Sequence, residues 1–186
     1  MSIRLMQEAF SSYYGKLVSK PHYFQNEDYS NIDVNIRACF RNGILPVKRD
    51  SETDFSVFRE KYGYTLPEEI QEYINLYWHG YICGFIEKMR LYSDEAVILF
   101  PVLKYQGEND NDVLYHRFGL LDLSDKWTKY GGDINKFIPV GWTGYSGGDI
   151  LYNTQTFNIH ITDLDENIIE DPIADSLSDL IRCLVP

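Results

Sequence analysis

The amino-acid sequence predicts an α+β fold in which helices pack on one mainly antiparallel, twisted sheet. Before Gly80, apolar side chains recur in several stretches at spacings of three and four, which is the period of an amphipathic helix. After Gly80, short runs rich in β-branched and aromatic residues alternate with turn-forming clusters. Strands joined by short loops pair antiparallel, because a parallel crossover needs roughly a dozen residues or more. Helices first, about six strands next and one short closing helix are typical of this fold class.

Three helices are expected in the first part of the chain, over residues 3–18, over residues 55–62 and from Leu66 to the Trp78-His79-Gly80 stretch. Asp54 is a suitable N-cap for the second helix, and Gly63 is a suitable residue to end it. Thr65 opens a capping-box pattern for the third helix, with Pro67 in its first turn. For residues 19–50 we expect irregular structure with a short helix at residues 33–39.

The strands are expected in six runs after Gly80: Tyr81–Ile86, Ala96–Leu103, Tyr115–Leu123, Phe137–Trp142, Asp149–Tyr152 and Phe157–Thr162. Clusters of Gly, Asn and Asp separate them and predict turns. An amphipathic stretch over Ile173–Ile181 predicts a short helix that packs on the sheet. The sequence contains no internal repeat, low-complexity segment or obvious linker, so we expect a single domain over residues 1–186.

The net charge of −11 is concentrated in the second half of the chain. Residues 1–93 carry a net charge of −1, and residues 94–186 carry −10. A field of this sign repels phosphate backbones and anionic membrane surfaces, so we expect neither nucleic acid nor a membrane as a partner. Basic proteins are the partners that such a field attracts. Solubility alone is an alternative explanation of the acidity.

Cysteine usage and hydropathy predict a cytoplasmic protein. Cys39, Cys83 and Cys183 are odd in number, lie far apart and stand in apolar surroundings, which predicts buried free thiols in a reducing compartment. The first residues lack an apolar run of signal-peptide length, and no run reaches transmembrane length.

Each sequence motif that would indicate a catalytic, phosphate-binding or metal-binding site is incomplete, so we expect no catalysis, no metal and no cofactor. Ser146-Gly147-Gly148-Asp149 lacks the Lys-Ser/Thr of a phosphate-binding loop and is interpreted as a hairpin turn. The segment 163–167 resembles the start of a calcium loop, but Ile168 stands where that loop requires glycine. The histidines have no zinc spacing: His22, His79, His116 and His160. A hydrolase with a carboxylate–histidine site made of Asp149 and His160 is the enzymatic alternative.

Tyrosine is abundant, at fifteen residues, and suits buried anchors at protein interfaces. We expect Trp142 in the core, and we expect Tyr145 and Tyr152 to be exposed because they flank the glycine turn near Asp149. The predicted partner-binding residues are the acidic and tyrosine side chains in this part of the chain: Tyr145, Asp149, Tyr152, Asp163, Asp165 and Glu166.

An ordered set of motifs resembles the SUKH (Smi1/Knr4-related) superfamily, in the branch that contains the SecY-interacting protein Syd. The matching pieces are Phe58–Gly63 and Leu66–Ile74 for a helix pair, Trp78-His79-Gly80 after it, and Gly148–Tyr152 and Ile173–Ile181 for a late hairpin and terminal helix. The resemblance covers about residues 55–184. It divides the chain into a family-like core, residues 51–186, and a helical or irregular N-terminal extension, residues 1–50.

The resemblance implies a non-catalytic α+β domain that binds another protein. Most members of the superfamily look like immunity proteins that neutralise a cognate bacterial toxin by direct binding. The alternative is a Syd-like regulator that binds the basic cytoplasmic loops of the SecY translocon subunit. The resemblance transfers no active-site residue to this chain.

Overall fold

In the computed structural model of the chain, the described residues are 2–17, 33–34, 46–63, 65–86, 96–111, 136–144, 148–163 and 165–186. Among them, five strands form an antiparallel sheet in the order β3-β4-β5-β6-β7. The strands are β3 (Ile82–Gly84), β4 (Val97–Leu99), β5 (Phe137–Thr143), β6 (Asp149–Asn153) and β7 (Ile159–Ile161). A separate antiparallel pair joins β1 (Val47–Lys48) to β2 (Tyr77–Trp78). The described helices are α1 (Ser2–Leu17), α3 (Ser56–Tyr62), α4 (Glu68–Leu76) and α7 (Leu177–Cys183).

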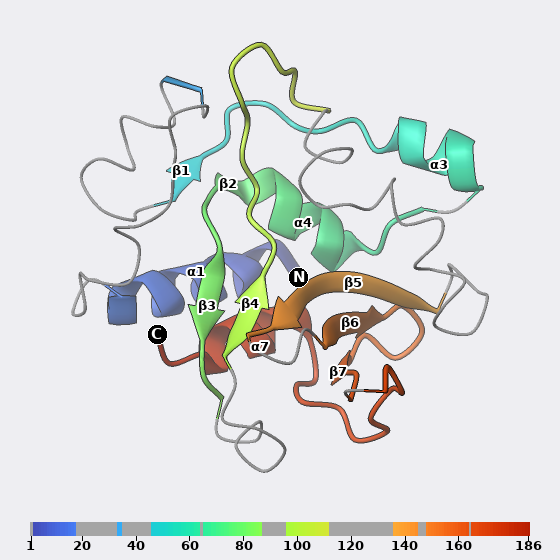
Figure 1. The fold of residues 1–186 in the computed structure, drawn as a ribbon. Coiled ribbons are helices and arrows are strands. Elements are labelled where there is room, and N and C mark those ends of the chain that lie inside the picture. The colour runs from blue at the N-terminus through green and yellow to red at the C-terminus, as the bar shows by residue number, and fades with distance from the viewer. Residues whose placement is uncertain are drawn as a thin grey trace.

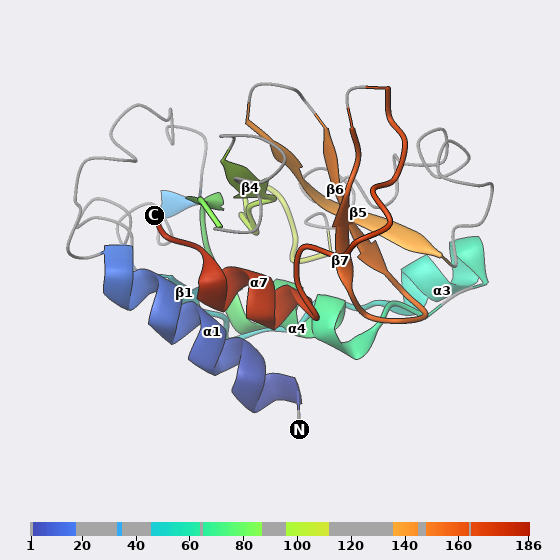
Figure 2. The same cartoon turned by 90° about the horizontal axis from the view of Figure 1, so that it is seen from below.

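Helices α1, α4 and α7 cover one face of the sheet (Figures 1 and 2). Strand alternation explains this layer, because successive side chains of a strand point to opposite faces. In β4, Val97 and Leu99 are buried toward the helices, whereas Ile98 between them is half-buried on the other face. From the helical side, Phe10 of α1 and Leu180 of α7 are almost fully buried in the same core.

Two buried tyrosines fasten the helices to the sheet through their hydroxyl groups. Tyr13 of α1 donates to the carbonyl of Cys83 at 2.9 Å, and its oxygen accepts from the N–H of Cys83 at 3.0 Å. Tyr73 of α4 donates to the carbonyl of Phe100 at 2.6 Å. Burial raises the pKa of both phenols, so each remains a hydrogen-bond donor at neutral pH.

The pairing of β5 with β6 contains an irregularity between Pro139 and Gly141. Proline lacks the N–H that a regular ladder requires and is accommodated at such bulges. Gly141 is needed here for a steric reason, because a Cβ at this position would lie 2.1 Å from the carbonyl oxygen of Ile98. The missing side chain of Gly141 therefore lets β5 lie tightly against β4.

The β1–β2 pair surrounds a buried arginine. Arg49 donates to the carbonyl of Ile74 at 2.9 Å and to the Thr53 hydroxyl at 3.1 Å, and its guanidinium lies 3.9 Å from the ring centroid of Trp78. Burial lowers the pKa of Arg49 to about 10, and nearby Asp110 counters part of that effect. His79, fully buried beside Phe10 and Tyr73, donates from Nδ1 to the carbonyl of Gly80 at 2.8 Å.

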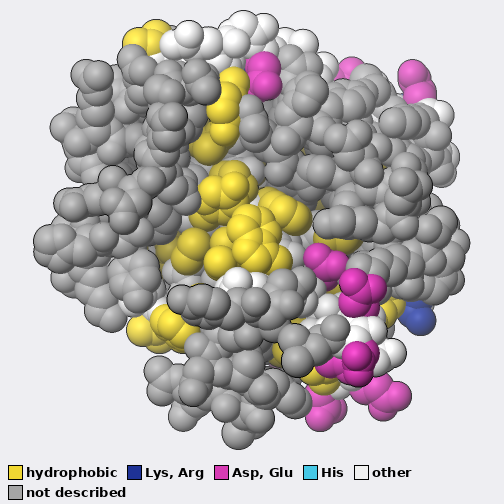
Figure 3. All heavy atoms as spheres, viewed as in Figure 1, with side chains coloured by type: hydrophobic (Ala, Val, Ile, Leu, Met, Phe, Trp, Pro, Cys, Tyr) yellow, Lys and Arg dark blue, Asp and Glu magenta, His cyan; other side chains and the backbone are white. Residues whose placement is uncertain are grey.

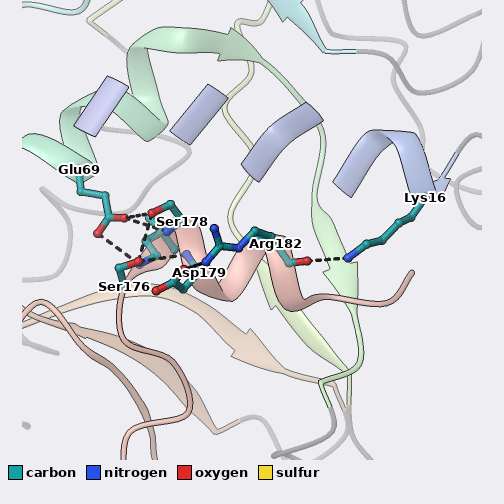
Figure 4. A network of polar contacts seen from close by, with 7 residues as sticks. Lys16, Glu69, Ser176, Ser178, Asp179 and Arg182 are labelled. Carbon is teal, nitrogen blue, oxygen red and sulfur yellow. Dashed lines mark hydrogen bonds and ion pairs between the residues drawn. The ribbon is translucent and has the colours of Figure 1, made fainter. Parts of the chain in front are cut away.

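Helix α7 is held at both ends by side chains from distant parts of the sequence (Figure 4). The Glu69 carboxylate of α4 accepts from the N–H groups of Leu177 at 3.2 Å and Ser178 at 2.8 Å, and from the Ser178 hydroxyl at 2.7 Å. At the other end, Lys16 of α1 donates to the carbonyls of Arg182 at 2.5 Å and Leu184 at 3.1 Å. A carboxylate at the N-terminus and an ammonium at the C-terminus both complement the helix dipole.

The predicted α+β class and the antiparallel sheet are confirmed. Five of the six predicted strands are present, and the run Tyr115–Leu123 lies outside the described residues, as does nearly all of the expected helix at 33–39. Gly63 ends α3 in the left-handed conformation, as expected. The predicted cap at Thr65 is wrong, because α4 begins at Glu68 and has no side-chain cap. Cys183 is exposed, which corrects its expected burial, while Cys39 lies outside the described residues.

Candidate partner-binding surface

A long segment of the second half of the chain is rich in carboxylates, of which Asp179 pairs with Arg182 at the end of the segment. Between Lys136 and Arg182 the sequence contains no lysine or arginine. The same segment carries eight carboxylates: Asp149, Asp163, Asp165, Glu166, Glu170, Asp171, Asp175 and Asp179. In Figure 3, acidic side chains gather on the side where β6, β7 and the loop after β7 lie. The local field at this end of the sheet is therefore negative.

The loop after β7 is built around the carboxylate of Asp163. Its Oδ1 accepts from the N–H groups of Asp165 at 2.9 Å and Asn167 at 2.8 Å, and its own N–H donates to the carbonyl of Asn167 at 2.9 Å. The hydrogen bonds that the Asp163 carboxylate accepts, first among them the one from the Asn167 backbone, lower the pKa of Asp163. Glu166 lies in the left-handed region, with φ of 65°. Asp163 thus holds the backbone of a turn in which Asp165 and Glu166 are both exposed.

Asp149 lies next to this loop at the open end of the β6–β7 hairpin. Its N–H donates to the hydroxyl of Thr162 at 2.9 Å, and its carbonyl accepts from the N–H of Thr162 at 3.0 Å. Thr162 immediately precedes Asp163, so the structure brings Asp149 and the acidic loop together. We call the set Asp149, Asp163, Asp165 and Glu166 the acidic end of the hairpin.

The expected exposure of Tyr152 is wrong. Its side chain is 1% exposed and belongs to the core that the helices cover. The reason is the two-residue period of a strand: positions 149 and 152 differ by an odd number, so their side chains point to opposite faces of β6. Tyr152 therefore cannot share a binding surface with Asp149. Tyr145 lies outside the described residues.

Aromatic side chains outside the predicted partner-binding set lie beside the acidic end. Trp142, expected in the core, is half-buried on the sheet face opposite the helices. In the sheet register it pairs with Ile98 on one side and with Asp149 on the other. The rings of Tyr81 and Phe100 each lie 5.4 Å from that of Trp142. Figure 3 shows apolar side chains exposed near the middle of this face. Trp142 and Asp149 share this face because they are cross-strand partners, a register that the structure provides.

The two histidines in the described residues have structural contacts. His160 donates from Nδ1 to the carbonyl of Ile169 at 3.0 Å, and its ring meets that of Phe137 edge-on at 5.9 Å. Burial lowers the pKa of His79 to about 4, so its imidazole is neutral at pH 7. Among the residues that the structure describes, no three His, Cys, Asp or Glu side chains are grouped as metal ligands.

In the described part of the chain, no helix is both long and apolar enough to span a membrane. Comparison of the chain with models of known protein families gives no match, and comparison with curated proteins gives none either. The resemblance to the SUKH superfamily therefore rests on the residues quoted for it and remains a proposal.

Proposed function

We propose that this chain is a non-catalytic binding protein that holds a cationic protein partner, and specifically an immunity protein that neutralises a cognate bacterial toxin by direct binding. The observation that carries the proposal is the acidic end of the hairpin, within a segment that has eight carboxylates and no lysine or arginine. The hydrogen bonds of Asp163 to the N–H groups of Asp165 and Asn167 support this role, because backbone that is already held costs less to order when a partner binds.

The neighbouring aromatic side chains supply the binding affinity that exposed carboxylates contribute little to. Exposed carboxylates raise association rates and discrimination more than affinity. Affinity at protein interfaces comes largely from aromatic anchors, and Trp142 with Phe100 and Tyr81 lies in register with Asp149. The toxin assignment, as opposed to another cationic partner, rests on the resemblance to the SUKH superfamily.

Affinity purification from the native host tests the proposal. The wild-type chain is compared with a charge-reversed variant, Asp165→Lys/Glu166→Lys, and with Glu60→Lys, a single reversal on the exposed surface of α3. We expect a toxin domain with wild type and with Glu60→Lys, and its loss with the double variant. Recovery of SecY would instead favour the Syd-like regulator. Recovery of the same partner by all three chains would contradict a role for the acidic end.

Catalysis by Asp149 and His160 is the competing hypothesis from another class. A hydrolase screen with added divalent metal distinguishes it, since we expect no activity from the wild-type chain. Activity that disappears in His160→Gln and is retained in Glu60→Lys would overturn the proposal of a non-catalytic protein.

A further inference from the structure

A groove of about 410 Å³ lies at the opposite end of the β6–β7 hairpin from the acidic end. It is formed by the beginning of α1, the first turn of α4, the start of α7 and the turn between β6 and β7, which lie close together in Figure 2. Its apolar lining is Leu5, Pro67, Tyr152 and Phe157, and its charged lining is Glu68 and Glu69.

Phe157 is held in a backbone conformation that bulky residues rarely adopt. Its φ is 68°, in the left-handed region, where glycine or asparagine is the usual choice. The turn fixes it there: the Phe157 N–H donates to the carbonyl of Asn153 at 2.8 Å, and the Asn153 side chain accepts from the N–H of Gln155 at 2.9 Å. Despite this constraint the side chain is 54% exposed, with its ring 6.5 Å from that of Tyr152. Folding alone does not favour phenylalanine at this position, whereas a role as a contact residue does.

Leu5 presents a second exposed apolar side chain to the same groove. It is 45% exposed, although the next residue, Met6, is fully buried in the core. Leu5 and Phe157 come from opposite ends of the sequence and converge on a preformed hollow. Apolar hollows with such a lining accept the anchor side chains of a partner.

The charges of the groove specify the chemistry of its occupant. Among the described residues that line it, both charged ones are carboxylates. Glu69 is fixed by its hydrogen bonds to the start of α7 (Figure 4), and Glu68 is exposed at the rim. An apolar hollow with a carboxylate at its edge complements an apolar side chain that has a cationic neighbour.

We propose that this groove is a second docking site, which takes a leucine-like side chain of a protein segment while an adjacent lysine or arginine pairs with Glu68. The site requires no contact with the acidic end of the hairpin, so it goes beyond the proposed function and can fail or succeed independently of it. A partner that is both cationic and amphipathic would be recognised at two separate places.

Titration with synthetic peptides, followed by amide NMR signals, tests the proposal. The probe is an amphipathic leucine–lysine peptide. Its two controls are a leucine–glutamate peptide with the same apolar pattern and a lysine–glutamine peptide without apolar residues. We expect the first peptide to shift signals around Leu5, Glu68 and Phe157. The leucine–glutamate peptide should bind at least about tenfold more weakly, because it lacks the cation that pairs with the carboxylate. The lysine–glutamine peptide should leave the groove signals unchanged.

Variants separate the groove from the acidic end. Phe157→Asn and Leu5→Gln should each weaken the leucine–lysine peptide about tenfold or more, since each removes part of an apolar anchor site. Asp165→Asn/Glu166→Gln should retain its binding at the groove. Unchanged binding in both groove variants would overturn the proposal. Concentration-dependent dimerisation that Phe157→Asn abolishes would also overturn it, because the occupant would then be a second copy of the chain.

Discussion

Replacing Glu69 by alanine removes the carboxylate that holds the start of α7, and the cost can be worked out from its contacts (Figure 4). The carboxylate accepts hydrogen bonds from Leu177 N–H at 3.2 Å, Ser178 N–H at 2.8 Å and the Ser178 hydroxyl at 2.7 Å. A hydrogen bond to a charged group contributes roughly 1.5–3 kcal/mol. The longest of these bonds is weak and water can replace part of the others, so we expect a loss of about 2–4 kcal/mol in the free energy of unfolding.

Urea unfolding at neutral pH, followed by circular dichroism, measures this loss. Glu68→Ala is the matched control, one residue away on the same helical turn and exposed. We expect the control to change the free energy of unfolding by no more than about 0.5 kcal/mol. A loss below about 1 kcal/mol in Glu69→Ala, or equal losses in the two variants, would refute the reasoning.

Three further predictions follow from buried or constrained positions. Burial lowers the pKa of His79 from 6.5 to about 4, so between these pH values the folded state binds fewer protons than the unfolded state. The contribution of neutral His79 to the free energy of unfolding is therefore complete above about pH 6.5 and is lost as the pH falls toward 4. The unfolding free energy of wild type relative to His79→Gln should thus fall by about 2 kcal/mol between pH 7.5 and 5, and a constant difference would contradict it. Gly141→Ala should prevent folding or cost more than about 3 kcal/mol, whereas Gly144→Ala, whose added Cβ would have ordinary contacts, should fold. Phe157→Asn should be as stable as wild type or more stable by thermal unfolding, because asparagine tolerates the left-handed region; a clear loss of stability would show that Phe157 serves the core.

Most helices and strands could be predicted because apolar residues recur in them at a regular spacing. Elements without such a spacing could not. The Tyr77–Trp78 strand was missed because its two residues continue the apolar stripe of α4, and its pairing with Val47–Lys48 depends on a distant segment. The start of α4 was placed too early because a capping pattern at Thr65 predicts a local hydrogen bond, whereas α4 follows Pro67 and has no side-chain cap.

The acidic end of the hairpin was predictable in composition, but its geometry was not. The predicted hairpin already placed Asp149 near the loop at 163–166, because β6 and β7 pair antiparallel and these residues lie at the same end of it. The hydrogen bonds by which Asp163 orders its loop depend on backbone dihedral angles that a sequence does not display. Tyr152 was misplaced for an avoidable reason, because strand parity already put it on the face opposite Asp149. The left-handed conformation of Phe157 had no sequence signal at all, since phenylalanine is not a residue that predicts it.

The most direct test of binding through the acidic end is partner recovery at two ionic strengths, about 0.1 M and about 1 M, where the screening length falls from roughly 10 Å to roughly 3 Å. Wild type should retain its partner at the lower salt concentration and lose most of it at the higher one, and Asp165→Asn/Glu166→Gln should recover little at either. A partner that both chains retain equally at both salt concentrations would contradict the account.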